Sequence, residues 1–297
     1  MQVGPISFVI PCFNSAATIE ACLDSVLLSA TSQDEIIICN NASSDLTTQI
    51  CQRLLLNSPI PYRIISKKTN VGPVKNWLYG ISESKHEWCK LVFSDDELLH
   101  QEFRLFRLSD IPDDCEGLFA SSFIQTSSSN RLAYDIRYPT GMITSEDFKR
   151  ELLSWRLPFS PTAMLFRKSY AVHVLQSQIL VVNEEVLQNG AGPDYALYLS
   201  AGLRGKLFYY KNPIARMNVS SQSITIRHGP EALRRQYFSA ALHYLHLSSH
   251  SDDLRYLMFR ESLREKVKER NFFSILLVLL KSPGGFLRLM AFMVFKG

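Results

Sequence analysis

Short apolar runs alternate with amphipathic stretches along the first hundred residues. The runs Ile6–Ile10, Glu35–Cys39, Tyr62–Ser66 and Trp88–Phe93 have the length and the β-branched or aromatic content of buried strands. Between them, apolar residues recur three or four positions apart, as they do on one face of a helix. The pattern therefore predicts a βαβαβαβ unit with its strands in one sheet.

Polar residues follow each predicted strand, where a turn leads into the next helix. Ser15 is expected to cap the helix that carries Ile19 and Leu23, and Asp45 stands at the start of the next one. Pro73 fits the first turn of the third helix. Because ligands of α/β proteins bind at the carboxyl ends of parallel strands, these turns are expected to border a binding crevice.

Two adjacent carboxylates follow the fourth apolar run, in the sequence Phe93-Ser94-Asp95-Asp96-Glu97. Hard oxygen ligands of this kind suit Mg²⁺ or Mn²⁺, and such a cation can hold the phosphates of a substrate. Aspartate is also common in turns and at helix caps. The pair alone therefore leaves a metal site and a solvated turn as alternatives.

Four polar segments stand in a characteristic order between residues 9 and 96. They are Val9–Asn14, Asn41–Asp45, Asn70–Gly72 and Ser94–Asp96, with Thr18-Ile19 and Cys22–Val26 after the first. In this order and spacing they resemble the nucleotide-binding half of the family-2 inverting glycosyltransferases. The resemblance implies the GT-A fold, an α/β architecture with a mixed, mainly parallel sheet flanked by helices.

The resemblance also implies which residues contact a nucleotide-sugar donor. The candidates on the sheet edge are Pro11, Phe13, Asn14, Asn40, Asn41, Asn70, Gly72, Ser94 and Asp96. The amides of Asn40 and Asn41 match donors and acceptors of a base or ribose, although each can instead close an Asx turn on its own backbone. A glycine at position 72 is likewise sufficient for a tight turn.

The chain departs from the family pattern at the fourth strand, because Phe93 takes the place of the first acid of Asp-x-Asp. Asp95 is therefore expected to ligate the divalent metal, Mn²⁺ or Mg²⁺, with Asp96 on sugar hydroxyls or supporting the metal site from behind. Phe13 replaces a common tyrosine and Asn40 an acid. Uridine is the expected base, and another nucleotide stays open.

In the second half, Asp194 follows a glycine-rich turn and precedes a short helical pattern. The resemblance implies that Asp194 is the general base that deprotonates the acceptor hydroxyl. An N-cap role is the alternative, and Glu184 and Glu185 are weaker candidates for the base. Arg216, in a segment that resembles a flexible loop over the donor, is expected to reach the pyrophosphate unless it is a surface arginine. Arg227 and His228 are further candidates for that contact.

The domain prediction is a GT-A domain over residues 1–228, with a nucleotide-binding half at 1–97 and an acceptor-side half at 98–228. A helical extension is expected over residues 229–297. In it, basic residues precede the apolar run Phe272–Leu280, which is shorter than the ~20 residues that span a bilayer. This run is predicted either to anchor at a membrane surface or to pack internally.

Composition and charge narrow the possible partners and the cellular location of the protein. The net charge of +4 is modest, and the sequence shows no pattern of alternating basic and aromatic residues. No nucleic-acid partner is therefore expected. Six cysteines without close pairing indicate reduced core thiols. No charged and apolar leader precedes the first predicted strand. A cytoplasmic location, at the inner face of the plasma membrane, is therefore expected.

Together these features predict an inverting glycosyltransferase that uses a nucleoside-diphosphate sugar, with a UDP-sugar favoured. The expected acceptor is a hydroxyl of a glycan or lipid-linked glycan in surface polysaccharide synthesis. Two alternatives stay open. One is a sugar-phosphate nucleotidyltransferase, and the other is a non-catalytic nucleotide- or glycan-binding protein of the same fold.

Overall fold

The computed structural model describes residues 3–133, 136, 138–153, 160–181, 192–219 and 236–237. The strands are β1 (Ile6–Cys12), β2 (Glu35–Asn40), β3 (Tyr62–Ser66), β4 (Trp88–Leu91), β5 (Glu97–Leu98), β6 (Gly117–Gln125), β7 (Asn130–Ala133), β8 (Gly141–Ile143), β9 (Met164–Arg167) and β10 (Leu207–Asn218). The helices are α1 (Ile19–Ser29), α2 (Thr47–Leu55), α3 (Pro73–Ser82), α4 (His100–Arg107), α5 (Ser145–Leu153), the 3₁₀ turn η1 (Pro161–Ala163), α6 (Lys168–Val181) and α8 (Pro193–Leu203).

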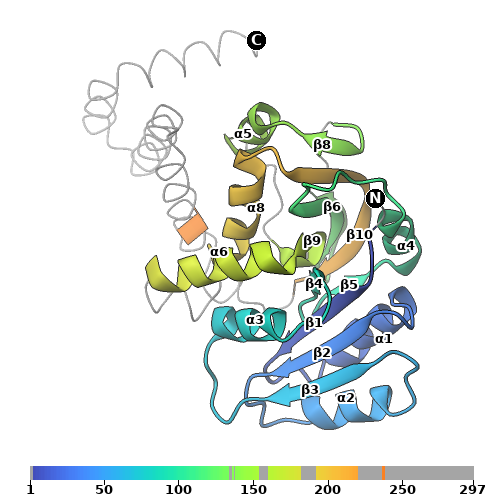
Figure 1. Ribbon diagram of the computed structural model, residues 1–297. Coiled ribbons are helices and arrows are strands. Elements are labelled where there is room, and N and C mark those ends of the chain that lie inside the picture. Colours follow the sequence, from blue (N-terminus) through green and yellow to red (C-terminus); the bar gives the residue numbers. More distant parts are fainter. Residues whose placement is uncertain are drawn as a thin grey trace, which may run out of the picture. The chain divides into compact units, whose positions relative to one another are not determined.

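One mixed sheet forms the centre of the part of the chain that the structure describes, with the strand order β3-β2-β1-β4-β9-β6-β10-β5 (Figure 1). The first four strands of the chain run parallel to one another, and β6 runs parallel to β10. Strand β9 lies antiparallel between β4 and β6 and so joins the two predicted halves in a single sheet. The predicted mixed, mainly parallel sheet flanked by helices is confirmed.

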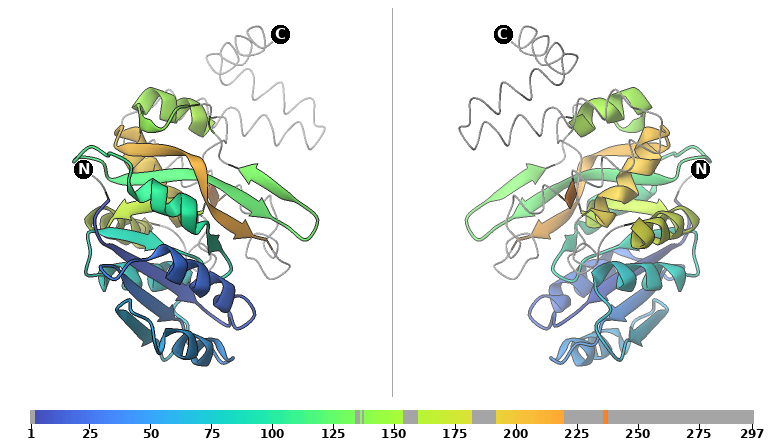
Figure 2. Two further views of the ribbon diagram at one scale, coloured as in Figure 1. Left: turned by 90° about the vertical axis from the view of Figure 1, so that its right-hand side faces the viewer. Right: turned by 90° about the vertical axis from the view of Figure 1, so that its left-hand side faces the viewer.

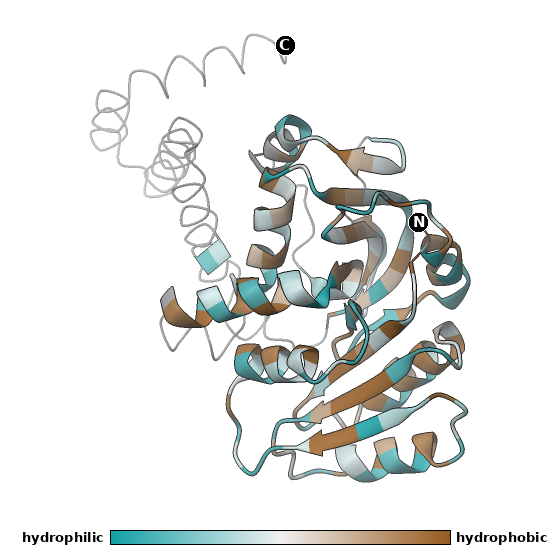
Figure 3. Ribbon diagram, in the orientation of Figure 1, coloured by the Kyte–Doolittle hydropathy of each residue, from teal (hydrophilic) through white to brown (hydrophobic). Residues whose placement is uncertain are grey.

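The period of two along β1 divides its side chains between the two faces of the sheet. Ile6, Phe8 and Ile10 pack into the core cluster that includes residues of α1, whereas Val9 faces α3. Figure 2 shows α1 and α4 from one side of the sheet and α3, α6 and α8 from the other. Both faces of β1 and β2 are covered, which explains why these strands are buried along their whole length and are mostly hydrophobic in their middle parts (Figure 3).

The start of α1 differs from the prediction. The helix begins at Ile19, and Ser15 does not cap it with its side chain. Instead, the Ser15 carbonyl accepts hydrogen bonds from the backbone N–H groups of Thr18 and Ile19, and its hydroxyl lies 2.8 Å from that of Ser94. Ser15 thus connects the β1–α1 loop to the turn after β4.

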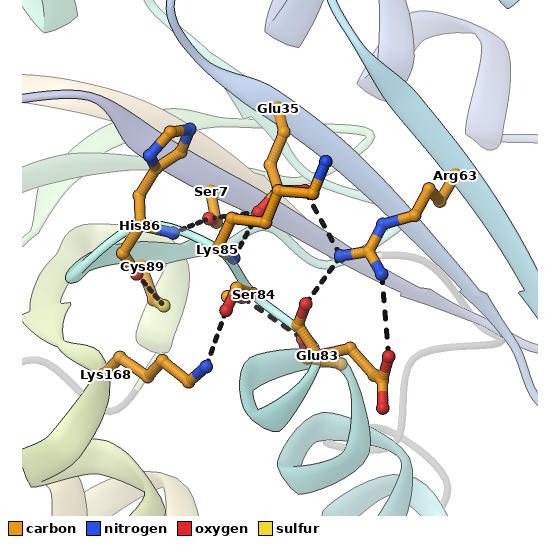
Figure 4. A network of polar contacts seen from close by, with 10 residues as sticks. Ser7, Glu35, Arg63, Glu83, Ser84, Lys85, His86, Cys89 and Lys168 are labelled. Carbon is orange, nitrogen blue, oxygen red and sulfur yellow. Dashed lines mark hydrogen bonds and ion pairs between the residues drawn. The ribbon is translucent and has the colours of Figure 1, made fainter.

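A polar network closes the amino edge of the sheet (Figure 4). The buried Glu35 carboxylate accepts hydrogen bonds from the Ser7 hydroxyl at 2.7 Å, the Lys85 backbone N–H at 2.5 Å and the Arg63 guanidinium at 3.2 Å. Burial acts to raise the pKa of Glu35, but these partners outweigh it and lower the pKa. The network holds the α3–β4 turn against β1–β3, on the edge opposite to the polar turns discussed below.

Three further predictions concern the cysteines, membrane-spanning helices and the C-terminal extension. All six cysteines are buried and free, as expected. Within the described residues no helix combines the length and apolarity that a membrane crossing requires. Apart from residues 236–237, the predicted helical extension lies outside the described residues, as do its boundary at residue 228 and Glu184, Glu185, Arg227 and His228.

Candidate active site

An acidic turn follows β4 and is held from two sides. The Asp96 carboxylate is 4% exposed, accepts a hydrogen bond from the Thr162 hydroxyl at 2.6 Å, and accepts a second from the Asn218 backbone N–H at 3.1 Å. Asn218 also donates its side-chain amide to the Asp95 carbonyl at 2.9 Å. No side chain in the described part of the chain donates to the Asp95 carboxylate, which is half-buried. Asp95 is therefore the member of the pair with oxygens left for a ligand.

A buried lysine stands behind this turn. Lys90 of β4 donates its ammonium group to the carbonyls of Thr162 and Met164, the latter at 2.9 Å. Burial lowers the pKa of Lys90 to about 7, against the opposing charge of Asp96. Burial raises the pKa of Asp96 strongly, and the neighbouring Asp95 raises it further. Burial also raises the pKa of Asp95. The charge of Asp96 acts directly on those of Lys90 and Asp95, and Thr162 contacts both Lys90 and Asp96.

The loops after β1 and β2 are bound to each other. Asn14, with φ of 50°, accepts a hydrogen bond from the Ser44 backbone N–H at 2.9 Å. Asp45 accepts one from the Ala16 backbone N–H at 2.9 Å and another from Thr47, so it fixes this pair of loops as well as the start of α2. Phe13, by contrast, is 48% exposed at the same edge. Pro11 is buried within β1 beside β2.

The Asn40 side chain is committed to the protein itself. Its amide nitrogen donates to the hydroxyls of Thr48 at 3.0 Å and Ser66 at 3.3 Å, and its oxygen accepts from the Ser43 backbone N–H at 3.0 Å. The last of these bonds is the turn interaction that the sequence left as the alternative. Asn40 is 5% exposed, so the geometry favours a framework role over direct contact with a base.

Asn41 has a similar place. Its amide donates to the Asn70 side chain at 2.8 Å and its oxygen accepts from the Val71 backbone N–H at 2.9 Å. Asn70 in turn accepts from the Gly72 backbone N–H at 2.8 Å, and Gly72 has φ of 83°, which suits glycine. Asn41, Asn70 and Gly72 thus form one hydrogen-bonded turn that leads into α3.

Asp194 lies at the first turn of α8, as the sequence predicted. One carboxylate oxygen accepts hydrogen bonds from the backbone N–H groups of Gly192 at 2.8 Å and Tyr195 at 2.7 Å, and the other accepts from the Tyr237 hydroxyl at 3.0 Å. Burial raises the pKa of Asp194 to about 7, although these hydrogen bonds oppose the shift. The group is therefore balanced between its acid and base forms near neutral pH.

The 3₁₀ turn η1 connects the two acidic sites. Thr162 in η1 binds Asp96, and the carbonyl of the preceding Ser160 accepts a hydrogen bond from Tyr198 of α8 at 2.7 Å. The segment that precedes β9 therefore contacts both the acidic turn and the helix that carries Asp194. One short segment thus links the acidic turn to α8.

Arg216 does not lie in a loop, contrary to expectation. It belongs to β10, beside β5, and its guanidinium lies 3.2 Å from the Glu97 carboxylate. Asn218 at the end of the same strand donates to the other oxygen of Glu97 at 3.0 Å. Arg216 is thus engaged by a carboxylate, and its predicted contact with pyrophosphate has no support from the geometry.

Sequence reasoning missed four residues of this region, Lys90, Thr162, Asn218 and Tyr237. Only Lys90 gave a usable signal, because a charged residue inside a buried apolar run needs an internal partner. Thr162 and Asn218 meet Asp96 across 66 and 122 residues of sequence, and nothing in the local pattern indicates such pairings.

The fold and the two acidic sites can now be set beside known proteins. A family model described as Glycosyl transferase family 2 matches residues 7–175, which is more than half of the chain. The chain belongs to glycosyltransferase family 2. The match covers the acidic turn, both loops at the carboxyl edge and η1 of this family-2 chain, and it ends before Asp194.

A curated relative and two solved structures extend the comparison. Over 94 residues the family-2 chain is 31% identical to the poly-beta-1,6-N-acetyl-D-glucosamine synthase of Staphylococcus epidermidis, which is 32% of this chain and only 22% of that protein. S. aureus TarS 1–349 in complex with UDP-GlcNAc superposes with a TM-score of 0.60 at 12% identity, covering 95% of this chain and 92% of that one. The mannosyltransferase PcManGT from Pyrobaculum calidifontis, in complex with GDP-Man and Mn²⁺, gives 0.51 at 11% identity, covering 96% and 83%. At these identities the structural likeness establishes the fold alone.

Proposed function

We propose that this family-2 protein transfers a sugar from a nucleoside-diphosphate sugar to a hydroxyl group, with inversion at the anomeric carbon. The observation that carries the proposal is the acidic turn at the carboxyl end of β4, where Asp95 keeps its carboxylate for a ligand while Asp96 is fixed by Thr162 and Asn218. A donor diphosphate and its cation fit such a position in an α/β sheet.

The favoured donor is a UDP-sugar, and UDP-GlcNAc is the leading candidate. The relative from S. epidermidis is named for a polymer of N-acetyl-D-glucosamine, and TarS was solved with UDP-GlcNAc. The exposed ring of Phe13, at the end of β1, is suited to stack on a base. In this proposal Asn40, Asn41 and Asn70 shape the floor of the nucleotide site through their turns, and Asn14 and Ser94 hold its loops.

The residues present fit a divalent cation that shares its ligands with the substrate. Among the described residues, no group of three His, Cys, Asp or Glu side chains gathers to hold a metal. Asp95 would therefore supply a protein oxygen, and the donor diphosphate would supply others, as Mg²⁺ commonly requires. When bound, Mg²⁺ or Mn²⁺ neutralises the charge that develops on the departing diphosphate. PcManGT was solved with Mn²⁺.

Asp194 is the proposed general base. In its ionised form it takes the proton of the acceptor hydroxyl as the acceptor oxygen bonds to the anomeric carbon and the bond from that carbon to the phosphate oxygen breaks. The nucleoside diphosphate leaves with the electrons of that bond. Attack from the opposite face inverts the configuration, and no covalent sugar–enzyme intermediate is needed. The two backbone N–H groups at the start of α8 hold one oxygen of Asp194 in place.

The proposed acceptor is a glycan or lipid-linked glycan of a surface polysaccharide, reached at the inner face of the plasma membrane. The relative named for a polysaccharide supports this choice.

Release of UDP from UDP-GlcNAc, with Mn²⁺ and N-acetylglucosamine oligosaccharides, tests the proposal. We expect turnover by the parent and a loss of about 10²–10⁴-fold in Asp194→Asn, because the general base is removed. Asp24→Asn, an exposed change on α1, is the matched control and should keep parental turnover. Equal rates in the parent and in Asp194→Asn would refute the assigned base. Pyrophosphate-dependent formation of UTP would instead support the nucleotidyltransferase alternative.

A further inference from the structure

Tyr237 lies against the first turn of α8, 43 residues beyond Asp194 in the sequence. Its hydroxyl donates to the Asp194 carboxylate at 3.0 Å. Its ring meets the buried ring of Tyr195 edge to face, with centroids 5.7 Å apart and an interplanar angle of 79°. Two separate contacts, one polar and one aromatic, therefore fix Tyr237 at the proposed base.

The hydrogen bonds of Asp194 divide unequally between its two oxygens. Oδ1 accepts from two backbone N–H groups and is filled. Oδ2 accepts from Tyr237, and a carboxylate oxygen has a second lone pair. Oδ2 is therefore the oxygen that can meet an acceptor hydroxyl, and Tyr237 is bound to that same atom.

We propose that Tyr237 is a positioning residue for Asp194: its hydroxyl orients the carboxylate and favours its ionised form, leaving one lone pair of Oδ2 for the acceptor hydroxyl. The inference rests on the proposed function, in which Asp194 is the base. A hydrogen bond to a charged group favours that charge most where water is excluded, and Asp194 is 6% exposed.

Charged groups on neighbouring elements could also influence Asp194. The described titratable side chains on α8 and on the elements packed against it are Glu146, Asp147 and Glu151 of α5, Lys168, Tyr170 and His173 of α6, Tyr195 and Tyr198 of α8 with Arg204 directly after it, and Tyr209, Tyr210, Lys211 and Arg216 of β10. The main influences on the pKa of Asp194 are burial and the hydrogen bonds from Gly192, Tyr195 and Tyr237. Tyr237 is the one side chain among these influences, which makes it the one to change.

Tyr237→Phe keeps a ring against Tyr195 and removes only the hydroxyl. Losing a hydrogen bond to the ionised form should raise the pKa of Asp194 by about one unit. We expect UDP release to fall about tenfold below pH 7, since a unit of pKa is a factor of ten in the ionised fraction. Above pH 8.5 the rate should recover to within about twofold of the parent, because the base is then ionised again. The KM for the donor should not change.

A second readout needs no substrate. Folded Asp194 holds its proton up to about pH 7, whereas an unfolded aspartate releases it near pH ~4. Through this group the folded state loses stability as pH rises between those values. At each pH, the Tm of Asp194→Asn is subtracted from that of the protein under test. The difference isolates the contribution of Asp194 from the contributions of the other acids. This Tm difference falls as the pH rises. In Tyr237→Phe the pH range over which it falls should extend about one pH unit higher than in the parent.

Tyr210→Phe is the matched control, because Tyr210 also donates to a carboxylate, that of Glu102, at 3.2 Å. It should leave both pH profiles of the parent unchanged. The inference is overturned if the parent is active and Tyr237→Phe has the parental pH midpoints, even with a uniformly lower rate or Tm. If the parent releases no UDP while the shift in the Tm profile is present, the proposed function fails and the link between Tyr237 and Asp194 stands.

Discussion

At the residue scale, Thr162 shows how a neutral side chain can support a buried charge. Its hydroxyl donates to Asp96 and accepts from the Phe93 backbone N–H at 3.3 Å. Thr162→Val is similar in shape but removes both bonds and leaves the buried Asp96 carboxylate with less support. We expect a loss of about 1–3 kcal/mol in the free energy of unfolding.

Urea unfolding of the parent, Thr162→Val and Thr162→Ser measures this loss. The serine variant keeps the hydroxyl, so its free energy of unfolding should be clearly closer to that of the parent than the valine variant's is. If the valine and serine variants were equally stable, the hydrogen bond to Asp96 would not be the reason for the threonine.

The pKa of Asp194, raised to about 7 by burial, predicts a pH dependence of transfer. A general base works when ionised, so kcat should fall about tenfold for each pH unit below 7 and level off above it. Measuring the rate of UDP release between pH 5 and pH 9 tests this expected fall in kcat below pH 7. A midpoint near pH 4, the value of an ordinary aspartate, would contradict the assignment of Asp194 as a buried base.

Single residues also show where sequence reasoning reached its limit. The helix start at Asp194 was predictable from the glycine-rich turn and the apolar spacing that follows it. The partners of Asn40 and Asn41 were not, because an amide in a turn can face a ligand or its own loop with the same local sequence. Only the packing of three loops against one another settles that choice.

At the scale of elements, the close approach of α3 to the sheet depends on Gly80. A Cβ atom at this position would lie 2.4 Å from the Cys39 sulfur and 2.5 Å from a Val9 methyl group, far inside normal contact. Gly80→Ala should therefore push α3 from β1 and β2 and cost about 1–3 kcal/mol in the free energy of unfolding, despite the better helix propensity of alanine.

Thermal or urea unfolding of Gly80→Ala checks this packing, with Gly4→Ala as its control. A Cβ at Gly4 would meet no atom within 4 Å, so that variant should be nearly as stable as the parent. Stability of Gly80→Ala equal to that of Gly4→Ala would show that α3 does not lie this close to the sheet.

The elements themselves were largely predictable where the period of the sequence was strong. The limits of β3 agree with the run Tyr62–Ser66, and α3 begins at Pro73 as expected. The sequence failed at Arg216, because the polar residues at the end of β10 resemble a loop although they pair with β5 and β6. Strand pairings such as Arg216 with Phe123 and Arg216 with Glu97 span 93 and 119 residues of sequence, and such distant pairings leave little local trace.

At the scale of the whole molecule, the sheet brings together loops that the sequence keeps apart. The turns after β1, β2 and β4 are joined by Asn14 to Ser44 and by Ser15 to Ser94, all at the carboxyl edge. The network around Glu35 closes the other edge. The amino edge is thus closed by polar contacts, and in the proposed function the carboxyl edge presents Phe13 and Asp95 to a ligand.

The central claim is that this edge binds a nucleoside diphosphate through a cation on Asp95. The direct measurement is the Tm of the parent, Asp95→Asn and Asp24→Asn with UDP, GDP, dTDP or CMP, each with and without Mn²⁺. A ligand at a hundred times its Kd adds about 2.7 kcal/mol, or roughly 5–10 °C in Tm for a domain of this size. We predict such a rise for the parent and Asp24→Asn with UDP and Mn²⁺, and none for Asp95→Asn. No rise with any nucleotide, or an equal rise in Asp95→Asn, would contradict the account.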